Sequence, residues 1–187
     1  MQKPQQILLG SQSPRRLEIL QQAGFEVQVF STDIEEIFPD DLDIHQVPEY
    51  LSNLKLSAVS AVLKDAQEMI ICADTVVIFD NKLIGKPINT NQSFDILKAM
   101  NGKPHEVITG VSMQYQNKRI SFSEKATVFF KILSDEEIWH YIHHFNTLDK
   151  AGAYNIQEFG GVEKLEGEFF NVMGLPIKRV LAEIEVW

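Results

Sequence analysis

The most apolar run of the sequence is Met69-Ile70-Ile71-Cys72-Ala73-Asp74-Thr75-Val76-Val77-Ile78-Phe79. A continuous run of this kind, rich in Ile and Val, is typical of a strand that is buried on both faces in an α/β sheet. A carboxylate inside it is costly to bury unless it is paired, protonated or bound to a metal. Asp74 therefore indicates a strand end facing a site, where it could hold a metal or act as a base. The alternative is a bulge or edge position at which Asp74 faces water.

Helices and strands alternate on both sides of this run. Ser13 and Pro14 predict an N-cap followed by proline at the first helical position, and Gly24 predicts the end of that helix. The remaining pattern predicts strands at 7–9, 25–31, 106–115 and 119–133, helices at 47–64, 91–100 and 134–145, a mobile acidic loop at 32–46, and a last helix after residue 176. This order predicts one mixed α/β domain over residues 1–187, with a cleft.

Composition limits the partners of the chain. Its 187 residues include 17 Lys and Arg against 26 Asp and Glu, which gives a net charge of −9. Such an acidic balance argues against stable nucleic-acid binding, because that requires clustered cations to neutralise phosphates. An anionic ligand would instead need a local basic pocket.

Other compositional features concern location. Cys72 is the single cysteine, so an intramolecular disulfide and a multi-cysteine metal site are excluded. Residues 1–6 are polar, without the apolar run of a signal peptide, and no window approaches 18 consecutive apolar residues. We therefore expect a cytoplasmic protein without a membrane span.

The segment after the first predicted strand is a candidate anion site. A helix N-terminus presents unpaired N–H groups and a partial positive charge. Arg15 and Arg16 in that first turn oppose the helix dipole, which suggests that the site is reserved for a negative ligand, with Ser11 and Ser13 as further donors. The alternative is a solvated arginine pair on an ordinary first turn.

Two further segments offer polar groups. Pro87 favours an extended conformation for Lys86, which would make this lysine a defined point charge for a phosphate, although a lysine before proline often marks only a turn. Gln157 ends a segment of small residues and carries both a donor and an acceptor, which suits the reading of a base edge. The alternative for this segment is a plain connection between a helix and a strand.

Taken together and in order, these motifs resemble the Maf (septum-formation-inhibitor-like) nucleoside triphosphate pyrophosphatases over nearly the full length. The motifs that carry the resemblance are Ser11-Gln12-Ser13-Pro14-Arg15-Arg16, Ile34-Glu35-Glu36, Lys55, Ala73-Asp74-Thr75-Val76-Val77, Gly85-Lys86-Pro87, Thr109-Gly110-Val111, Asp149-Lys150-Ala151-Gly152-Ala153-Tyr154-Asn155-Ile156-Gln157 and Asn171-Val172-Met173-Gly174-Leu175-Pro176. The chain departs from the family at Gly10, where alanine is usual, which we expect to be a harmless loss of a methyl group.

The resemblance implies a mixed sheet with two lobes around a deep cleft, similar to inosine triphosphate pyrophosphatases. It also implies metal-dependent hydrolysis of a nucleoside triphosphate to the monophosphate and pyrophosphate, with Mg²⁺ or Mn²⁺ as the cation and a homodimer as the assembly. Arg15, Thr75 and Gln157 match the positions that distinguish the group acting on dTTP and UTP.

The resemblance assigns roles to the remaining residues as well. Asp74 is expected to be the catalytic base and, with Glu36, a metal ligand; neighbouring Glu35 is the alternative to Glu36. The residues expected to bind the substrate are Ser11, Arg15, Arg16, Lys55, Thr75, Lys86 and Gln157. The cellular roles implied are the removal of modified nucleotides and an arrest of cell division. The alternatives are a nucleotide sensor of septum formation that does not catalyse and a pyrophosphatase of broader specificity for modified nucleotides.

Overall fold

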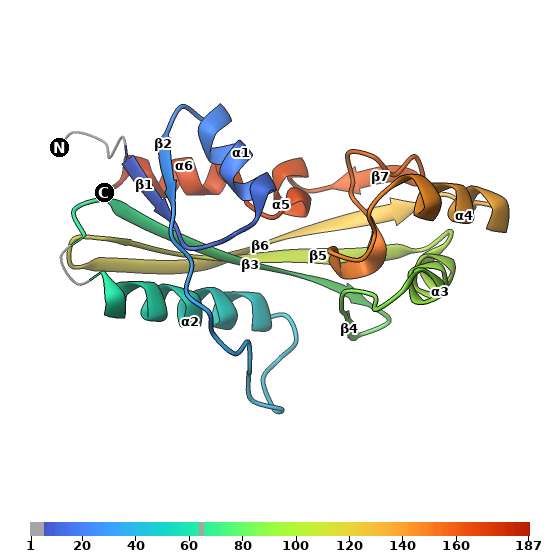
Figure 1. The fold of residues 1–187 in the computed structure, drawn as a ribbon, viewed down its shortest axis with the longest axis horizontal. Helices are drawn as coiled ribbons and strands as arrows, with labels where there is room; N and C mark the ends of the chain where they lie inside the picture. Colours follow the sequence, from blue (N-terminus) through green and yellow to red (C-terminus); the bar gives the residue numbers. More distant parts are fainter. Residues whose placement is uncertain (1–5, 64–65) are drawn as a thin grey trace.

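The computed structural model describes residues 6–63 and 66–187 and contains a single seven-stranded sheet flanked by helices (Figure 1). The predicted mixed α/β class is confirmed. The elements in chain order are β1 (Gln6–Leu9), α1 (Pro14–Gln22), β2 (Glu26–Val29), α2 (Val47–Val62), β3 (Met69–Phe79), β4 (Lys82–Ile84), α3 (Thr90–Met100), β5 (Pro104–Tyr115), β6 (Lys118–Phe130), α4 (Asp135–His144), the 3₁₀ turn η1 (Ala151–Ala153), β7 (Val162–Glu166), α5 (Phe169–Met173) and α6 (Ile177–Glu185).

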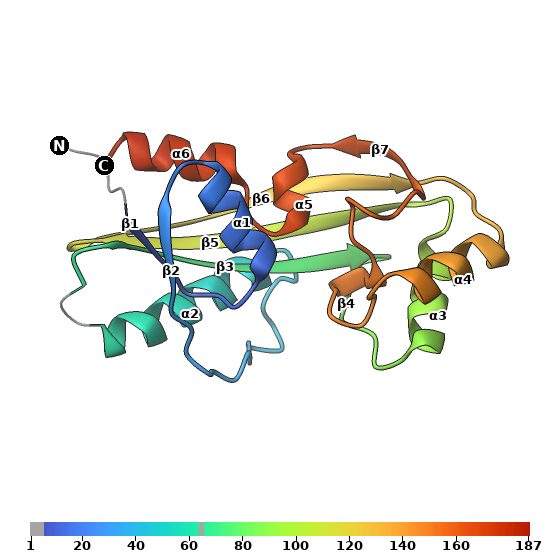
Figure 2. The same ribbon diagram turned by 45° about the horizontal axis from the view of Figure 1, so that its top comes forward.

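The sheet is built around β3. The strand order is β2-β1-β3-β5-β6-β7, and β4 also pairs with β3. β1 runs parallel to β3, whereas β5 and β4 run antiparallel to it. The long strands β3, β5 and β6 run along the long axis of the molecule, and β1 and the C-terminus lie at the same end of it (Figures 1 and 2). These three strands pass under both hydrophobic cores described below, so one sheet supports both lobes of the protein.

Side chains alternate between the two faces of β3, and both lobes contact the face that carries its odd-numbered residues. On the face that carries the odd-numbered residues, two separate hydrophobic cores form at the two ends of the strand. The first core includes Ile7, Leu9, Ile19, Leu20, Met69, Ile71, Ala73, Val111, Met113, Leu175 and Val180. The second core includes Val77, Phe79, Leu97, Met100, Val107, Val128, Phe130, Ile138, Tyr141 and Tyr154. Thr75 and its partner Thr109 on β5 lie between the two cores.

Helix α2 covers the opposite face of the sheet (Figures 1 and 2). Its residues Leu56 and Val59 pack against Leu8, Ile70 and Cys72. The start of the helix approaches β5 so closely that a Cβ on Gly110 would lie 2.2 Å from the backbone nitrogen of Glu49. Only glycine permits this approach, and it fixes the position of α2 over β3.

Most of the predicted elements are present, with shifted ends. The buried central strand, the helix after it and the hairpin of β5 and β6 are confirmed. Ser134 caps α4 through a capping box with Glu137. Gly24 follows the end of α1, as predicted, with a φ of +90°. Ser13 occupies the N-cap position of α1, but its hydroxyl makes no capping bond. Residues 1–5 and the predicted helix end at residue 64 lie outside the described residues.

The acidic segment 31–46 contains neither a helix nor a strand. It is attached near its end, where the His45 ring lies 2.9 Å from Asp43 Oδ1 and 3.0 Å from Glu106 Oε2 on β5. In the described part of the chain, no helix is both long enough and apolar enough to cross a membrane.

Gly10 has a packing role that the sequence did not show. A Cβ at this position would lie 2.2 Å from Cys72 Sγ and 3.2 Å from Val59 Cγ2. The first distance is far inside van der Waals contact, so the missing methyl group makes room for the buried cysteine under the loop that follows β1.

Candidate functional site

A gap along one edge of β3 forms the site. β1 pairs with β3 only at Met69–Ile71, and β4 pairs with the same edge only at Val77–Phe79. Among the described residues no strand covers this edge between the two segments. A cavity of about 1070 Å³ opens there, and its lining includes Asp74, Thr75 and Val76.

The cavity brings together eight of the nine residues expected to act in catalysis or binding. Those eight are Ser11, Arg15, Arg16, Glu36, Lys55, Asp74, Thr75 and Lys86. They come from the loop before α1, the first turn of that helix, the acidic segment, α2, β3 and the loop after β4. Glu36, and not Glu35, is the acidic-segment carboxylate in the lining.

Asp74 lies on the α2 face of the sheet and forms an ion pair there. Lys55 Nζ is 2.5 Å from Asp74 Oδ1 and 2.8 Å from Glu36 Oε1. The side chains of Lys55 and Asp74 are only 15% and 12% exposed, whereas that of Glu36 is 54% exposed. Burial raises the pKa of Glu36, but the hydrogen bond and charge of Lys55 and the charge of Lys86 outweigh it, so that pKa lies below its usual value. One ammonium thus joins two carboxylates.

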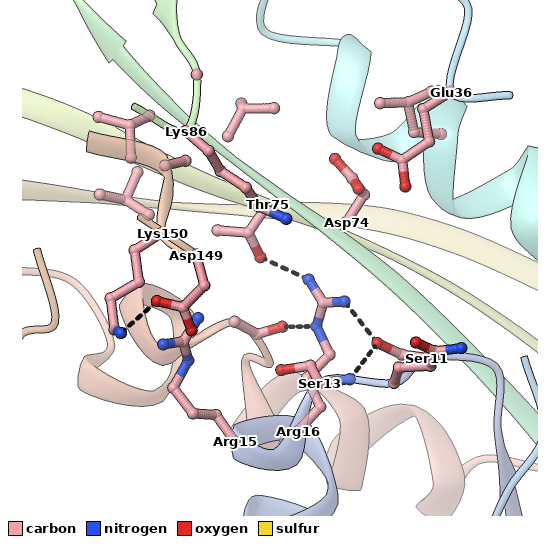
Figure 3. A pocket seen from close by; sticks show the side chains of 18 of the residues that line it. Ser11, Ser13, Arg15, Arg16, Glu36, Asp74, Thr75, Lys86, Asp149 and Lys150 are labelled. Atoms are coloured by element: carbon pink, nitrogen blue, oxygen red, sulfur yellow. Dashed lines mark hydrogen bonds and ion pairs between the residues drawn. The ribbon is translucent and has the colours of Figure 1, made fainter. Parts of the chain in front are cut away.

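Thr75 lies on the other face and binds the arginine of α1 (Figure 3). Arg16 Nη2 donates to Thr75 Oγ1 at 3.0 Å, Nη1 donates to Ser11 Oγ at 2.9 Å, and Nε donates to the carbonyl oxygen of Gly174 at 2.8 Å. Arg16 is buried, and this burial lowers the pKa of its guanidinium, while the charge of Asp74 acts in the opposite direction. The guanidinium is therefore held on three sides.

The hydroxyl protons in this region have one consistent arrangement. Thr109 Oγ1 donates to the carbonyl oxygen of Asn171 at 2.8 Å and lies 2.9 Å from Thr75 Oγ1. Because a hydroxyl has a single proton, Thr109 accepts from Thr75. Thr75 in turn accepts from Arg16. The chain of bonds runs from Arg16 through both threonines to α5, and it leaves Thr75 only acceptor capacity for a ligand.

Ser11 has the complementary property. Its Oγ accepts from Arg16 Nη1 and from the backbone N–H of Ser13 at 3.2 Å. Both bonds use the oxygen as acceptor, so the hydroxyl proton remains available to a ligand. The same loop leads into the first turn of α1, whose N–H groups and dipole favour an anion. This side of the cavity can therefore bind phosphate oxygens.

A second set of charged side chains, Arg15, Asp149 and Lys150, lies across the cavity from Glu36 and Asp74 (Figure 3). Arg15 points towards Asp149 and Lys150 (Figure 3). Lys150 is buried and donates to Asp149 Oδ1 at 2.7 Å and to the carbonyl oxygen of Asn146 at 2.6 Å. Burial raises the pKa of Asp149, but Lys150 and the charge of Arg15 outweigh it and hold that pKa below its usual value. Asp149 and Lys150 line the cavity, although they were absent from the expected site.

Lys86 and Gln157 occupy the periphery. Lys86 is exposed and lines the cavity, and it forms no ion pair within the described residues. Gln157 is exposed and is not part of the lining, which extends as far as the neighbouring Asn155 and Ile156. Its backbone N–H donates to Asn155 Oδ1 at 3.2 Å. The base-reading role of Gln157 therefore stays a prediction.

The donor set suits a hard divalent cation that is shared with a substrate. Across the described residues, no group of three or more His, Cys, Asp or Glu side chains could hold a metal ion. Glu36 and Asp74 supply two carboxylates that already share one cation, the ammonium of Lys55. Mg²⁺ is commonly held by one or two carboxylates together with substrate phosphates and water. The pair fits such an ion if a phosphate completes its ligands.

Comparison with known proteins gives consistent results over the whole chain. Residues 6–187 match the family model described as Maf-like protein. A dTTP/UTP pyrophosphatase of Cytophaga hutchinsonii is 41% identical over 182 residues, which cover 96% of this chain and 83% of the relative. A dTTP/UTP pyrophosphatase of Phocaeicola vulgatus is 42% identical over 183 residues, which cover 96% of this chain and 94% of the relative.

A solved structure supports the fold assignment. The Ham1 protein of Staphylococcus aureus superposes with a TM-score of 0.56, covering 97% of this chain and 98% of its own. The two sequences are 14% identical, so the likeness concerns the fold alone.

Proposed function

The chain belongs to the Maf family, and from this premise we propose that it hydrolyses nucleoside triphosphates, preferentially dTTP and UTP, to the monophosphate and pyrophosphate. The observation that carries the proposal is the convergence of Arg16, Lys55, Lys86 and Asp74 in one cavity of an otherwise acidic protein. Cations in a partly enclosed site suit a triphosphate, and a carboxylate among them suits the activation of water.

Glu36 and Asp74 lie on one side of the cavity and Arg15 and Asp149 on the other, which suggests how a nucleotide lies in it (Figure 3). We place the triphosphate on the side of Glu36 and Asp74, where it can take hydrogen bonds from the hydroxyl of Ser11, the guanidinium of Arg16 and the ammonium of Lys86. The base then lies towards Arg15 and Asp149 on the opposite side (Figure 3). Thr75 lies between these two sides (Figure 3), and its acceptor-only hydroxyl can take a hydrogen bond from a substrate N–H group.

Asp74 is the proposed general base. Its Oδ1 accepts from Lys55, and Oδ2 has no hydrogen-bond partner among the described residues, which leaves it to accept a proton from water. The water oxygen forms a bond to the α-phosphorus as the bond from that phosphorus to the bridging oxygen breaks, and pyrophosphate leaves. Arg16 and Lys86 bind the phosphate oxygens on which charge develops. Glu36 and Asp74 would hold Mg²⁺ or Mn²⁺, which supplies charge neutralisation at the phosphates.

Product analysis tests the proposal. The protein is incubated with each NTP and dNTP in the presence of Mg²⁺ or Mn²⁺, and the products are separated. We expect pyrophosphate and the monophosphate, fastest from dTTP and UTP. Orthophosphate with a diphosphate would exclude attack at the α-phosphate, and binding without turnover would favour a nucleotide sensor.

Isotope labelling locates the bond that breaks. Hydrolysis in H₂¹⁸O places the label in the monophosphate when water attacks the α-phosphorus, and in pyrophosphate when it attacks the β-phosphorus. The same assay with modified pyrimidine triphosphates compares the preferred canonical substrate with damaged ones, which addresses the proposed role in removing modified nucleotides.

A further inference from the structure

We infer that Lys55 holds the place of the metal in the nucleotide-free protein and leaves it only when a triphosphate binds, so that metal binding depends on the nucleotide. The inference rests on the proposed function. It changes the expected role of Lys55 from a fixed phosphate ligand to a cation that moves between the carboxylates and the phosphates.

The first observation is the position of the ammonium. Lys55 Nζ contacts Asp74 Oδ1 and Glu36 Oε1, one oxygen from each of the two carboxylates proposed to bind the metal. The side chains of Lys55 and Asp74 are largely withdrawn from water, so their attraction is screened less than that of a surface pair. A divalent cation that binds both carboxylates through these oxygens must displace the ammonium.

The second observation is the balance of charge. The two carboxylates and the ammonium together carry a net charge of −1, and the protein offers no further acidic ligand there within the described residues. A divalent cation beside the retained ammonium would face a like charge at short range. A triphosphate removes this obstacle in two ways, because its oxygens attract the ammonium and also complete the metal's ligands.

The third observation is that Lys55 can move while its helix stays in place. α2 is fixed against β5 by the close approach at Gly110, and its buried residues Leu56 and Val59 lie in a packed core. The lysine side chain itself has a flexible four-carbon stem. Rotation of that stem moves the ammonium from the carboxylates towards the cavity without any shift of the backbone.

The test measures Mn²⁺ binding to the nucleotide-free protein by isothermal titration calorimetry and by electron paramagnetic resonance. Lys55→Met keeps an apolar stem of similar length and removes the charge. We expect it to bind Mn²⁺ about tenfold more tightly than the wild type, and Lys55→Arg to bind as weakly as the wild type. The gain should disappear in the double variant Lys55→Met/Glu36→Gln, which lacks one of the two ligands.

Lys86→Met is the matched control. It removes the same charge from the same cavity, but from a lysine that forms no ion pair within the described residues. Equal Mn²⁺ affinities of Lys55→Met and the wild type would overturn the inference, and so would an equal gain in Lys86→Met, because the effect would then be one of general charge.

The wild type provides an independent measurement that needs no substitution. Its Mn²⁺ affinity should rise about tenfold or more when a non-hydrolysable α,β-methylene analogue of dUTP is present, and this coupling should shrink in Lys55→Met. Unchanged Mn²⁺ affinity in the presence of bound analogue would overturn the inference. Failure of the proposed function would instead appear as absent pyrophosphate release by the wild type, which the binding measurements do not involve.

Discussion

Arg16 of α1 donates a hydrogen bond from Nη2 to Oγ1 of Thr75 on the central strand, at 3.0 Å. The bond lies where the two hydrophobic cores meet, and it connects the first helix to the strand that also carries Asp74. A residue expected to read the base thus holds the arginine expected to bind phosphate. We therefore propose that base selection and phosphate binding are linked through one hydroxyl group.

Replacing Thr75 by valine should lower kcat/KM for dTTP about tenfold. The shape of the side chain is kept, but Arg16 loses an acceptor and Thr109 loses a donor, so the guanidinium is less well held in both the ground state and the transition state. Steady-state kinetics measure the effect, and Thr75→Ser should behave like the wild type. An equal loss in the serine variant would contradict a role for the hydroxyl.

Asp74→Asn should lower turnover by a factor of about 10² to 10⁴ while nucleotide binding is retained. The amide cannot accept the proton of water, yet it keeps a hydrogen-bond acceptor for Lys55. Pyrophosphate release and calorimetry with a non-hydrolysable analogue measure the two properties separately. Glu35→Gln, an exposed change outside the cavity lining, is the control and should be neutral. Near-normal turnover in Asp74→Asn would remove Asp74 from the chemistry.

Gly10→Ala should destabilise the protein by about 1–3 kcal/mol, because overpacking in a filled interior costs this much. The added methyl group would meet Cys72 Sγ at 2.2 Å. The double variant Gly10→Ala/Cys72→Ala removes the clash and should recover most of the loss. Urea unfolding of the wild type, both single variants and the double variant forms a complete cycle. Additive effects in that cycle would show that the two residues do not interact.

His105 should make stability fall as the solution becomes acidic. Burial lowers the pKa of His105 from its ordinary value of 6.5 to about 4. Between pH 6.5 and pH 4 the unfolded chain therefore binds more protons than the folded protein does. The contribution of His105 to the free energy of unfolding is complete above pH 6.5 and is lost as the pH falls towards 4. Between pH 7 and pH 5 the loss should be about 2 kcal/mol.

Urea unfolding at pH 5, 6 and 7 measures this loss. His105→Gln has no titrating group at the position and should show a flatter dependence, although its stability at neutral pH will be lower because Tyr154 loses its partner. Parallel pH profiles for the two proteins would contradict the assignment.

The sequence was informative about the fold wherever a pattern was local. The run 69–79 specified the central strand, because its hydrophobicity is continuous, and Pro14 and Gly24 marked the start and the end of the first helix. The short elements α5 and η1 were not predicted, since five and three residues are too few to show a period. The packing of Gly10 against Cys72 could not be predicted because the two residues are distant in sequence and adjacent only in the fold.

In the candidate site, too, local motifs could be predicted, whereas contacts between segments that are distant in sequence could not. The motifs identified most of the side chains that line the cavity, but they could not show that Lys55 joins Glu36 to Asp74 or that Thr75 binds Arg16. These relationships depend on how α1 and α2 are placed on opposite faces of the sheet. Asp149 and Lys150 belong to one of the motifs shared with the family, yet no sequence pattern showed that Arg15 points towards them (Figure 3).

The alternation of side chains along β3 limits how this protein can change in evolution. Asp74 and Thr75 are neighbours in sequence, and they serve the two faces of the sheet separately. A substitution can therefore alter the contacts on one face of the sheet without altering those on the other face. An inserted or deleted residue before them would exchange their faces, turning the carboxylate towards Arg16 and the hydroxyl towards Lys55. The spacing along this strand must stay constant in a working lineage even where the residues themselves vary.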